Sequence, residues 1–246
     1  MKSFAVLLLS CMIVFPAKTS DFSMNSGQVI LVIADNWEKS CAFMHLLDRD
    51  SAGWKTWRTD IPVNIGRNGL GWGLGLHPAG LSGPVKREGD GKAPAGVFTL
   101  GHAMGYSAFL PFDSRIGYVQ LTKNLHGVDD SDSDYYNRIV DITTIDGGWR
   151  KYWTSHETMR RDDNLYKWLV VVNHNRQCIP MGGSMIFMHI WRGHGLGTAG
   201  CTAMTEFDIL DLIRWLDPEK KPVLVQLPLE AYKEYCEKWD LPEVSL

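Results

Sequence analysis

A strand followed by a glycine-rich loop, in the stretch 185–204, constrains the fold of this chain more than any other feature. Ile186, Met188 and Ile190 alternate with aromatic or polar side chains, which is the period-2 pattern of a β-strand. No helical pattern of about 10 to 15 residues separates the strand-like runs in the first 60 residues, which argues against a doubly wound α/β sheet. We therefore expect a mainly β (α+β) fold with a few short helices, arranged as a barrel or a sandwich.

The glycine-rich loop leads to a cysteine, Cys201, in a setting that suggests catalysis. Gly200 directly before it permits a sharp turn, and we expect the Gly200 amide to be free to point at a reacting oxygen. Thr205 is the expected N-cap of a helix, with Asp208 as its partner. Cys201 should then lie just ahead of a helix start, where the helix dipole favours a thiolate. His189, upstream, is the candidate base.

This arrangement resembles the catalytic domain of the L,D-transpeptidases, the YkuD family. The family signature is a histidine followed, after a gap, by Ser/Thr-His-Gly-Cys. Ala199 replaces the second histidine here, and Ala203 stands where the family often has an arginine. A second block, KREGDGKAPAGVFTLG at 86–101, resembles the Gly-Asp-Gly-Lys-x-Pro-x-Gly-x-Phe block of the family and is interpreted as a structural marker. The residues that match the signature are His189, Thr198, Gly200 and Cys201.

The resemblance implies an acyl transfer on peptidoglycan stem peptides. Cys201 would attack the bond between the L-centre of a diamino acid and D-alanine, and form a thioester. His189 would manage the proton, and amides near Gly200 would stabilise the oxyanion. The acyl group would pass to the side-chain amine of a second stem. Arg192 and His194, in the loop, are candidates for the substrate contacts that the two alanines cannot make, or are simply solvated charges.

Other functions remain open at this stage. An L,D-carboxypeptidase or endopeptidase would use the same cysteine and pass the acyl group to water. A non-catalytic wall-binding relative would keep the fold without turnover. A metallohydrolase using His189, His194 and Cys201 is a weaker alternative, because their spacing fits no common zinc pattern and the chain has no HExxH motif. We expect neither a metal nor another cofactor.

An acidic and aromatic insertion, at 129–165, interrupts the strand-rich pattern. It begins DDSDSDYYN and contains Trp149 and Trp153, so it has too many large aromatic side chains for a linker. We expect it to fold as a cap over the barrel. The cap could select the substrate, as loops on rigid scaffolds often do, or its tryptophans could form a small core of their own.

The N-terminal segment, 1–20, has the pattern of a secretory signal peptide: Lys2, a short apolar run and then small residues. We expect an exported protein of the periplasm or cell envelope, with 21–246 as one catalytic domain, and lipidation at Cys11 as a minor alternative. Removal of 1–20 leaves 23 basic against 28 acidic side chains, a net charge of about −5, which argues against nucleic acid as a partner. The sequence contains no second hydrophobic segment that would predict a membrane span.

Four cysteines follow the predicted signal peptide, and their spacings contain no CxxC motif. With Cys201 as a free nucleophile, at least one of Cys41, Cys178 and Cys236 must stay unpaired within the chain. The sequence determines neither the pairing of these three nor the oligomeric state.

Overall fold

Eight strands close into a barrel in the computed structural model, which describes residues 24–245. The predicted signal peptide, with Cys11, lies outside these residues. Each strand of the ring pairs with the next, and the last pairs with the first. In ring order they are β1 (Gln28–Ala34), β2 (Cys41–Asp50), β3 (Gly53–Asn64), β12 (Thr202–Met204), β11 (Phe187–Ile190), β10 (Trp168–Val172), β5 (Ala93–Gly105) and β13 (Val223–Pro228).

The long strand β5 decides between a barrel and a sandwich. Residues 96–99 of β5 pair with β13, and residues 100–105 pair with β10. One strand therefore joins both ends of the sheet and closes the ring, which leaves no free edge among these eight strands. Two short strands, β4 (Leu70–Trp72) and β6 (Tyr118–Gln120), extend the sheet beside β5. The predicted mainly β class is thus confirmed, and its form is a closed barrel.

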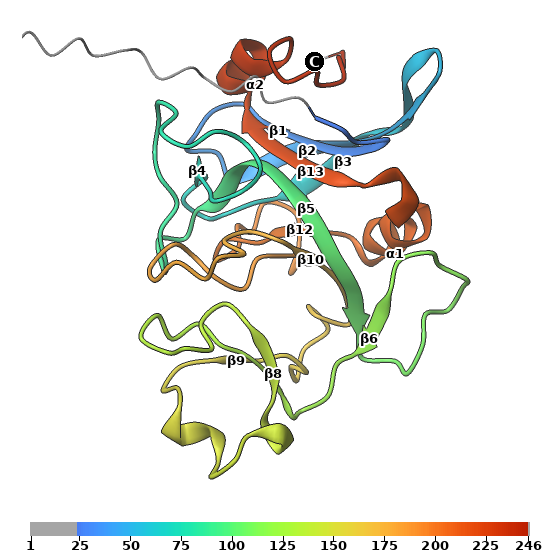
Figure 1. Cartoon of the computed structure of the whole chain (residues 1–246). Coiled ribbons are helices and arrows are strands. Elements are labelled where there is room, and N and C mark those ends of the chain that lie inside the picture. Colours follow the sequence, from blue (N-terminus) through green and yellow to red (C-terminus); the bar gives the residue numbers. More distant parts are fainter. Residues whose placement is uncertain (1–23, 246) are drawn as a thin grey trace, which may run out of the picture.

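Strand β1 lies at the centre of the apolar core. All seven of its residues are buried, between the antiparallel β2 and the parallel β13. A short uninterrupted run of aliphatic residues such as QVILVIA is typical of a strand covered on both faces. Helix α2 (Leu229–Tyr235) directly follows β13 and packs at one end of the barrel (Figure 1).

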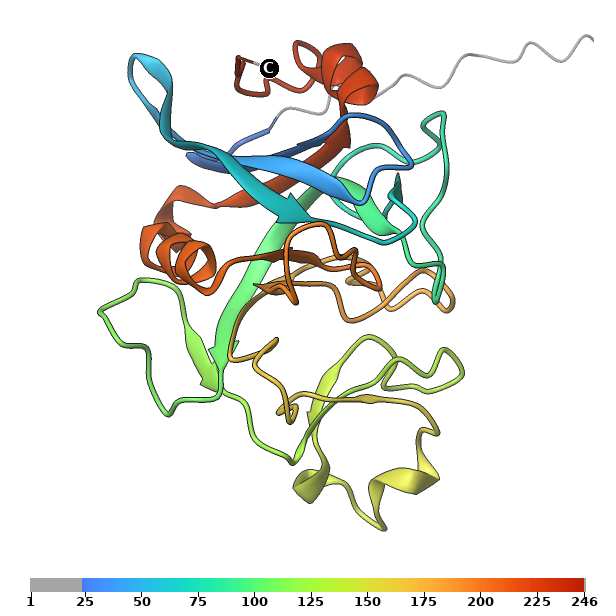
Figure 2. The ribbon, with the colours of Figure 1, turned by 180° about the vertical axis from the view of Figure 1, so that it is seen from behind.

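Helix α1 (Glu206–Trp215) packs on another side of the barrel, as Figures 1 and 2 show. The predicted N-cap is confirmed, because Thr205 Oγ1 accepts the Asp208 N–H at 3.1 Å. The apolar face of the helix is buried, and Arg58 of β3 donates hydrogen bonds to the carboxylates of Asp208 and Asp211 at 2.8 and 2.7 Å. These contacts fix the helix on the barrel.

The predicted position of Cys201 just ahead of this helix is wrong. Strand β12 lies between Cys201 and α1, and its three residues advance the chain by about 10 Å. The dipole effect is confined to the first turn of a helix, so α1 is too far away to favour a thiolate at Cys201.

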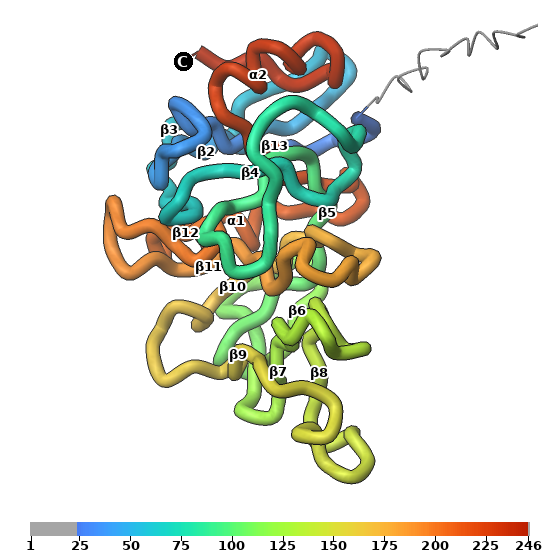
Figure 3. The backbone as a smooth tube through the Cα atoms, turned by 90° about the vertical axis from the view of Figure 1, so that its left-hand side faces the viewer, coloured from blue at the N-terminus to red at the C-terminus, as the bar shows by residue number. Residues whose placement is uncertain are grey.

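A separate lobe, residues 125–159, lies at the opposite end of the molecule from α2 (Figures 1 and 3). It contains most of the predicted insertion and starts slightly earlier, because its central strand precedes residue 129. Its tryptophans do form a core: Trp153 is buried, stacks on Trp149 and lies edge-on to Tyr135. The elements of the lobe are β7 (Leu125–Gly127), β8 (Ile139–Asp141), η1 (Ile142–Thr144), η2 (Trp149–Lys151) and β9 (Glu157–Thr158).

None of the helices found in residues 24–245 is long and apolar enough to cross a membrane. The remaining short helix, η3 (Pro218–Lys220), precedes β13 and contributes nothing to the site described below.

Candidate active site

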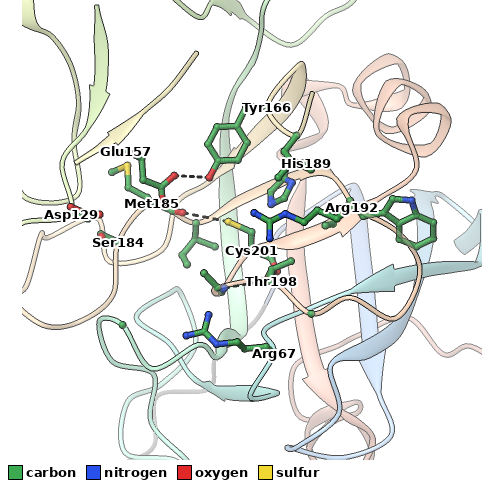
Figure 4. A pocket seen from close by; sticks show the side chains of 18 of the residues that line it. Arg67, Asp129, Glu157, Tyr166, Ser184, Met185, His189, Arg192, Thr198 and Cys201 are labelled. Atoms are coloured by element: carbon green, nitrogen blue, oxygen red, sulfur yellow. Dashed lines mark hydrogen bonds between the residues drawn. The ribbon is translucent and has the colours of Figure 1, made fainter. Parts of the chain in front are cut away.

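A cavity of about 520 Å³ is lined by residues of the barrel, the loop after β11 and the lobe. The barrel side supplies His189 and Cys201, and the lobe supplies Asp129 and Glu157. Figure 4 shows the side chains around this space. Of the six predicted site residues, five line the cavity: Cys201, His189, Gly200, Thr198 and Arg192.

The sixth, His194, is exposed and does not line the cavity. Its ring packs edge-on against Trp191, with the ring centroids 5.8 Å apart. Within residues 24–245 no group of three His, Cys, Asp or Glu side chains is placed to hold a metal ion.

The parallel pairing of β11 with β12 brings His189 and Cys201 to one face. Met188 lies opposite Thr202, and His189 lies opposite Ala203. Alternate residues of a strand share a face, so Cys201, two residues before Ala203, is on the same side as His189. The sequence could suggest this juxtaposition through the strand pattern, but only the register of the two strands establishes it.

The Cys201 thiol is held by the backbone at the start of β11. The Phe187 N–H donates to Cys201 Sγ at 3.4 Å, and the thiol donates to the Met185 carbonyl at 3.5 Å. Met185 has a left-handed φ of 50°, which is uncommon for a residue other than glycine. Its N–H donates to Asn137 Oδ1 of the lobe at 3.1 Å. A chain of contacts therefore runs from the lobe to the sulfur.

Both members of the candidate pair are uncharged near neutral pH. Burial raises the pKa of Cys201 to about 12, and the nearby Glu157 carboxylate adds to this rise. Burial lowers the pKa of His189 to about 4. The expected thiolate is therefore absent from the free protein, and the sulfur must lose its proton when it attacks.

The tautomer of His189 follows from its partner. His189 Nδ1 lies 2.7 Å from the Ile190 carbonyl oxygen, which can only accept a hydrogen bond. Nδ1 therefore carries the proton, and Nε2 keeps a free lone pair. In the part of the chain that the structure describes, no hydrogen bond joins His189 to Cys201. The ring lies edge-on to Tyr166, with the centroids 5.2 Å apart.

The turn before Cys201 is closed by Thr198. Its hydroxyl donates to the Cys201 carbonyl at 2.6 Å and accepts the Gly200 N–H at 3.1 Å. The Gly200 amide is thus occupied, and the expectation that it points freely at a reacting oxygen is wrong. A side chain at position 200 would lie 3.0 Å from the Lys92 carbonyl oxygen, which explains the glycine. The backbone amide of Cys201 itself is the better candidate for an oxyanion donor.

The block at 86–101 reaches the cavity as well as building a turn. The Asp90 carboxylate accepts hydrogen bonds from Lys86 Nζ at 2.7 Å and from the amides of Arg87 and Lys92 at 2.7 and 2.8 Å. This is the structural role that the sequence indicated. Lys86 and Glu88, however, also line the cavity, which the sequence alone did not indicate.

Two further cavity residues, Glu157 and Tyr166, form a hydrogen-bonded pair beside the candidate catalytic residues. Tyr166 donates its hydroxyl proton to Glu157 Oε2 at 2.6 Å. Burial raises the pKa of both groups, that of Tyr166 well above its ordinary value. No local motif marks either residue, because they come from the lobe and from the chain entering β10 and meet only in the fold.

The four described cysteines are all free. Cys201 is buried, whereas Cys41, Cys178 and Cys236 are half-buried and none of them lines the cavity. Of the four thiols, only that of Cys201 is therefore placed beside a histidine in the cavity.

No protein-family model and no curated protein matches this chain. Among solved structures, the chain is similar to the helical cell shape determining protein Pgp2 from Campylobacter jejuni, with 15% identity and a TM-score of 0.37. The match covers 86% of this chain and 53% of that protein, so the chain spans about half the length of that structure. A similarity of this size establishes neither a common fold nor a common activity.

Proposed function

We propose that this protein is a cysteine-dependent acyltransferase of the L,D-transpeptidase type that acts on peptidoglycan stem peptides. One observation carries the proposal: Cys201 and His189, the candidate nucleophile and base among the residues that match the family signature, line the same cavity. The substrate class follows from the resemblance at 189–201 and 86–101. An exported location, in the periplasm or cell envelope, is part of the same proposal.

The neutral pair defines the order of proton transfers. His189 Nε2 takes the thiol proton as Cys201 Sγ attacks the carbonyl carbon of the diamino acid. The imidazolium then gives that proton to the departing D-alanine amine, which leaves a thioester on Cys201. In the second half, the acceptor amine attacks the thioester and loses its proton to His189, which returns it to the sulfur.

Burial of the pair supports this mechanism. A buried thiolate is costly, so the thiol stays protonated until a substrate is present, which limits oxidation and side reactions. Once the carbonyl is in place, negative charge moves from sulfur to the carbonyl oxygen. The Cys201 amide is the candidate donor to that oxygen, because the Gly200 amide is already bonded to Thr198.

Two guanidinium groups can replace the arginine that the family often has at position 203. Arg67 and Arg192 line the cavity, and neither has a side-chain hydrogen bond or ion pair within residues 24–245. Each can take the terminal carboxylate of the D-alanine in a bidentate contact.

The proposal is tested by incubating the purified protein with a tetrapeptide-stem muropeptide, with and without a second stem as acceptor. Crosslinked product that requires the acceptor supports transpeptidation, whereas release of D-alanine without crosslinking identifies a hydrolase of the same bond. Intact-mass measurement should detect the thioester in the parent and not in Cys201→Ala. Absence of both products and of the adduct, with a well-folded parent, would overturn the proposal.

A further inference from the structure

The charges around the cavity are divided between its two sides. Asp129, Ser184 and Glu157 lie on the left of Cys201 in Figure 4, while Arg192 lies on the right and Arg67 below. The sulfur therefore stands between a group of acceptor oxygens and a group of guanidinium donors. We call the first group, Asp129, Glu157 and Ser184, the acidic end.

The acidic end holds polar atoms that have no partner. Ser184 is 8% exposed, and its Oγ has no hydrogen bond among residues 24–245. Asp129 Oδ1 is buried in the same way and is also without a partner in the described chain. Buried polar atoms in folded proteins are nearly always bonded, so two of them beside one cavity indicate a group that enters and bonds to them.

The acidic end is positioned by contact between the lobe and the barrel. Gly127 pairs with Glu157, and a side chain at position 127 would lie only 2.4 Å from Met185 Sδ. The glycine therefore allows β7 to pack directly against the segment that carries Ser184 and Met185. Asp129, two residues after Gly127, is positioned by the same contact.

The other charged residues of the cavity are already paired. Lys86 is bonded to Asp90 at 2.7 Å, and Arg161 forms a bidentate ion pair with Asp163 at 2.9 and 2.8 Å. Glu88 accepts the Tyr136 hydroxyl at 2.5 Å. Asp129, Arg67 and Arg192 line the same cavity and form no ion pair within residues 24–245.

We propose that the acidic end binds the side-chain ammonium of the diamino acid whose carbonyl Cys201 attacks, an inference that rests on the proposed function. An ammonium has three N–H donors, and Asp129 Oδ1, Ser184 Oγ and the Glu157 carboxylate provide three acceptors. A substrate held in this way has its ammonium on one side of the scissile bond and its terminal carboxylate, at Arg67 and Arg192, on the other. The lobe is then the part of the protein that selects the third residue of the stem.

The test compares two donor tetrapeptides that differ in one charge: a stem with lysine at the third position and the same stem with Nε-acetyllysine. The parent should turn over the lysine stem about 10- to 100-fold better in kcat/KM, because hydrogen bonds to a charged group are lost on acetylation. Asp129→Asn should reduce this ratio several-fold, because the site loses one negative charge while Ser184 and Glu157 stay in place. Asp134→Asn, an exposed acidic residue of the same lobe outside the cavity lining, is the matched control and should keep the full ratio.

Ser184→Ala provides a second variant in case Asp129→Asn does not fold, and a partial loss of the ratio is expected from it. Equal turnover of both stems by the parent, or an unchanged ratio in both variants, would overturn the inference while leaving the proposed function intact. If the parent neither binds nor turns over either stem, the proposed function fails and the inference fails with it.

Discussion

The barrel and the lobe bury their side chains in different ways. The barrel has a continuous, mainly aliphatic core in which Leu31 and Phe98 are fully buried, and its strands form a closed hydrogen-bonded ring. The lobe has three short strands around aromatic rings, and His126 stacks on His156 with ring centroids 3.7 Å apart. The Nδ1 atoms of both histidines and the Trp153 Nε1 are buried without a partner among the described residues.

This difference suggests a division of labour. A closed aliphatic barrel can hold a buried nucleophile and its base in one geometry, because little in it can rearrange at low cost. Buried polar groups without a partner lower the stability of a small lobe. Such groups occur where a ligand binds or where the conformation changes. Under the proposed function, the barrel carries the chemistry and the lobe carries the selection of substrate.

The largest expected effect is on the barrel side. Cys201→Ala should abolish turnover and thioester formation and leave the fold nearly intact, because a small buried side chain replaces another. Cys201→Ser should be almost as inactive, since a hydroxyl has a far higher pKa than a thiol. Intact-mass measurement after mixing with a carbapenem, a drug class that acylates the cysteine of L,D-transpeptidases, tests directly whether Cys201 is the nucleophile. An adduct that persists in Cys201→Ala would remove Cys201 from the mechanism, and Cys178→Ser is the control that should react normally.

His189→Gln should lower kcat by about 10²- to 10⁴-fold, which is the usual contribution of a positioned acid–base group. The amide keeps a polar side chain of similar length but cannot take the thiol proton. Single-turnover kinetics of thioester formation is the measurement. A loss smaller than about 10-fold would be too little for a general base and would assign the proton to another group.

Two core substitutions compare the stability of the regions. Leu31→Ala should lower the free energy of unfolding of the whole chain by about 2–5 kcal/mol. Trp153→Ala, also in a fully buried position, should instead open the lobe and leave β1 almost unaffected. Urea denaturation gives the first value, and hydrogen exchange resolved by segment gives the second. Loss of protection in β1 in the Trp153 variant would show that the two regions unfold together.

Alkylation of Cys201 should be slow near neutral pH and should increase with pH. Only the thiolate reacts, and the pKa of Cys201 is raised to about 12 by burial. The rate should rise about 10-fold per pH unit from pH 7 to 9 without reaching a plateau. Iodoacetamide labelling of Cys201, followed by peptide mass spectrometry, measures this. A plateau below pH 8 would indicate a preformed thiolate and contradict the neutral pair.

The smallest effect is the response of the lobe to acid. Burial lowers the pKa of His126 to about 4, and His156 is also lowered, so the folded lobe binds fewer protons than the unfolded lobe between about pH 6.5 and 4. Stability is therefore present above pH 6.5 and declines as the pH falls through this window. Hydrogen exchange in 125–159 at pH 7 and pH 5 should show the loss. His126→Phe should reduce the pH dependence of lobe opening, and an unchanged dependence would exclude this histidine.

Local patterns in the sequence determined much of the barrel. The alternation around Ile186–Ile190, the aliphatic run of β1 and the cap at Thr205 each depend on neighbouring residues in the chain, so they could be predicted without the fold. The glycine-rich motif before Cys201 and the upstream His189 could also be identified from the sequence, but only the register of β11 and β12 places them on one face. Closure of the barrel could not be predicted in this way, because it depends on two separate halves of β5 meeting strands distant in sequence.

Tertiary structure alone decided the charge state of the site and the composition of the cavity. The pKa of Cys201 depends on its burial, and burial arises from packing among segments that are far apart in the chain. Strand β12 separates Cys201 from the helix that the sequence placed beside it, and Thr198 occupies the amide expected to be free. Asp129, Glu157, Arg67 and Ser184 carry no motif, because their shared position depends on how the lobe packs against the barrel and not on the order of residues along the chain.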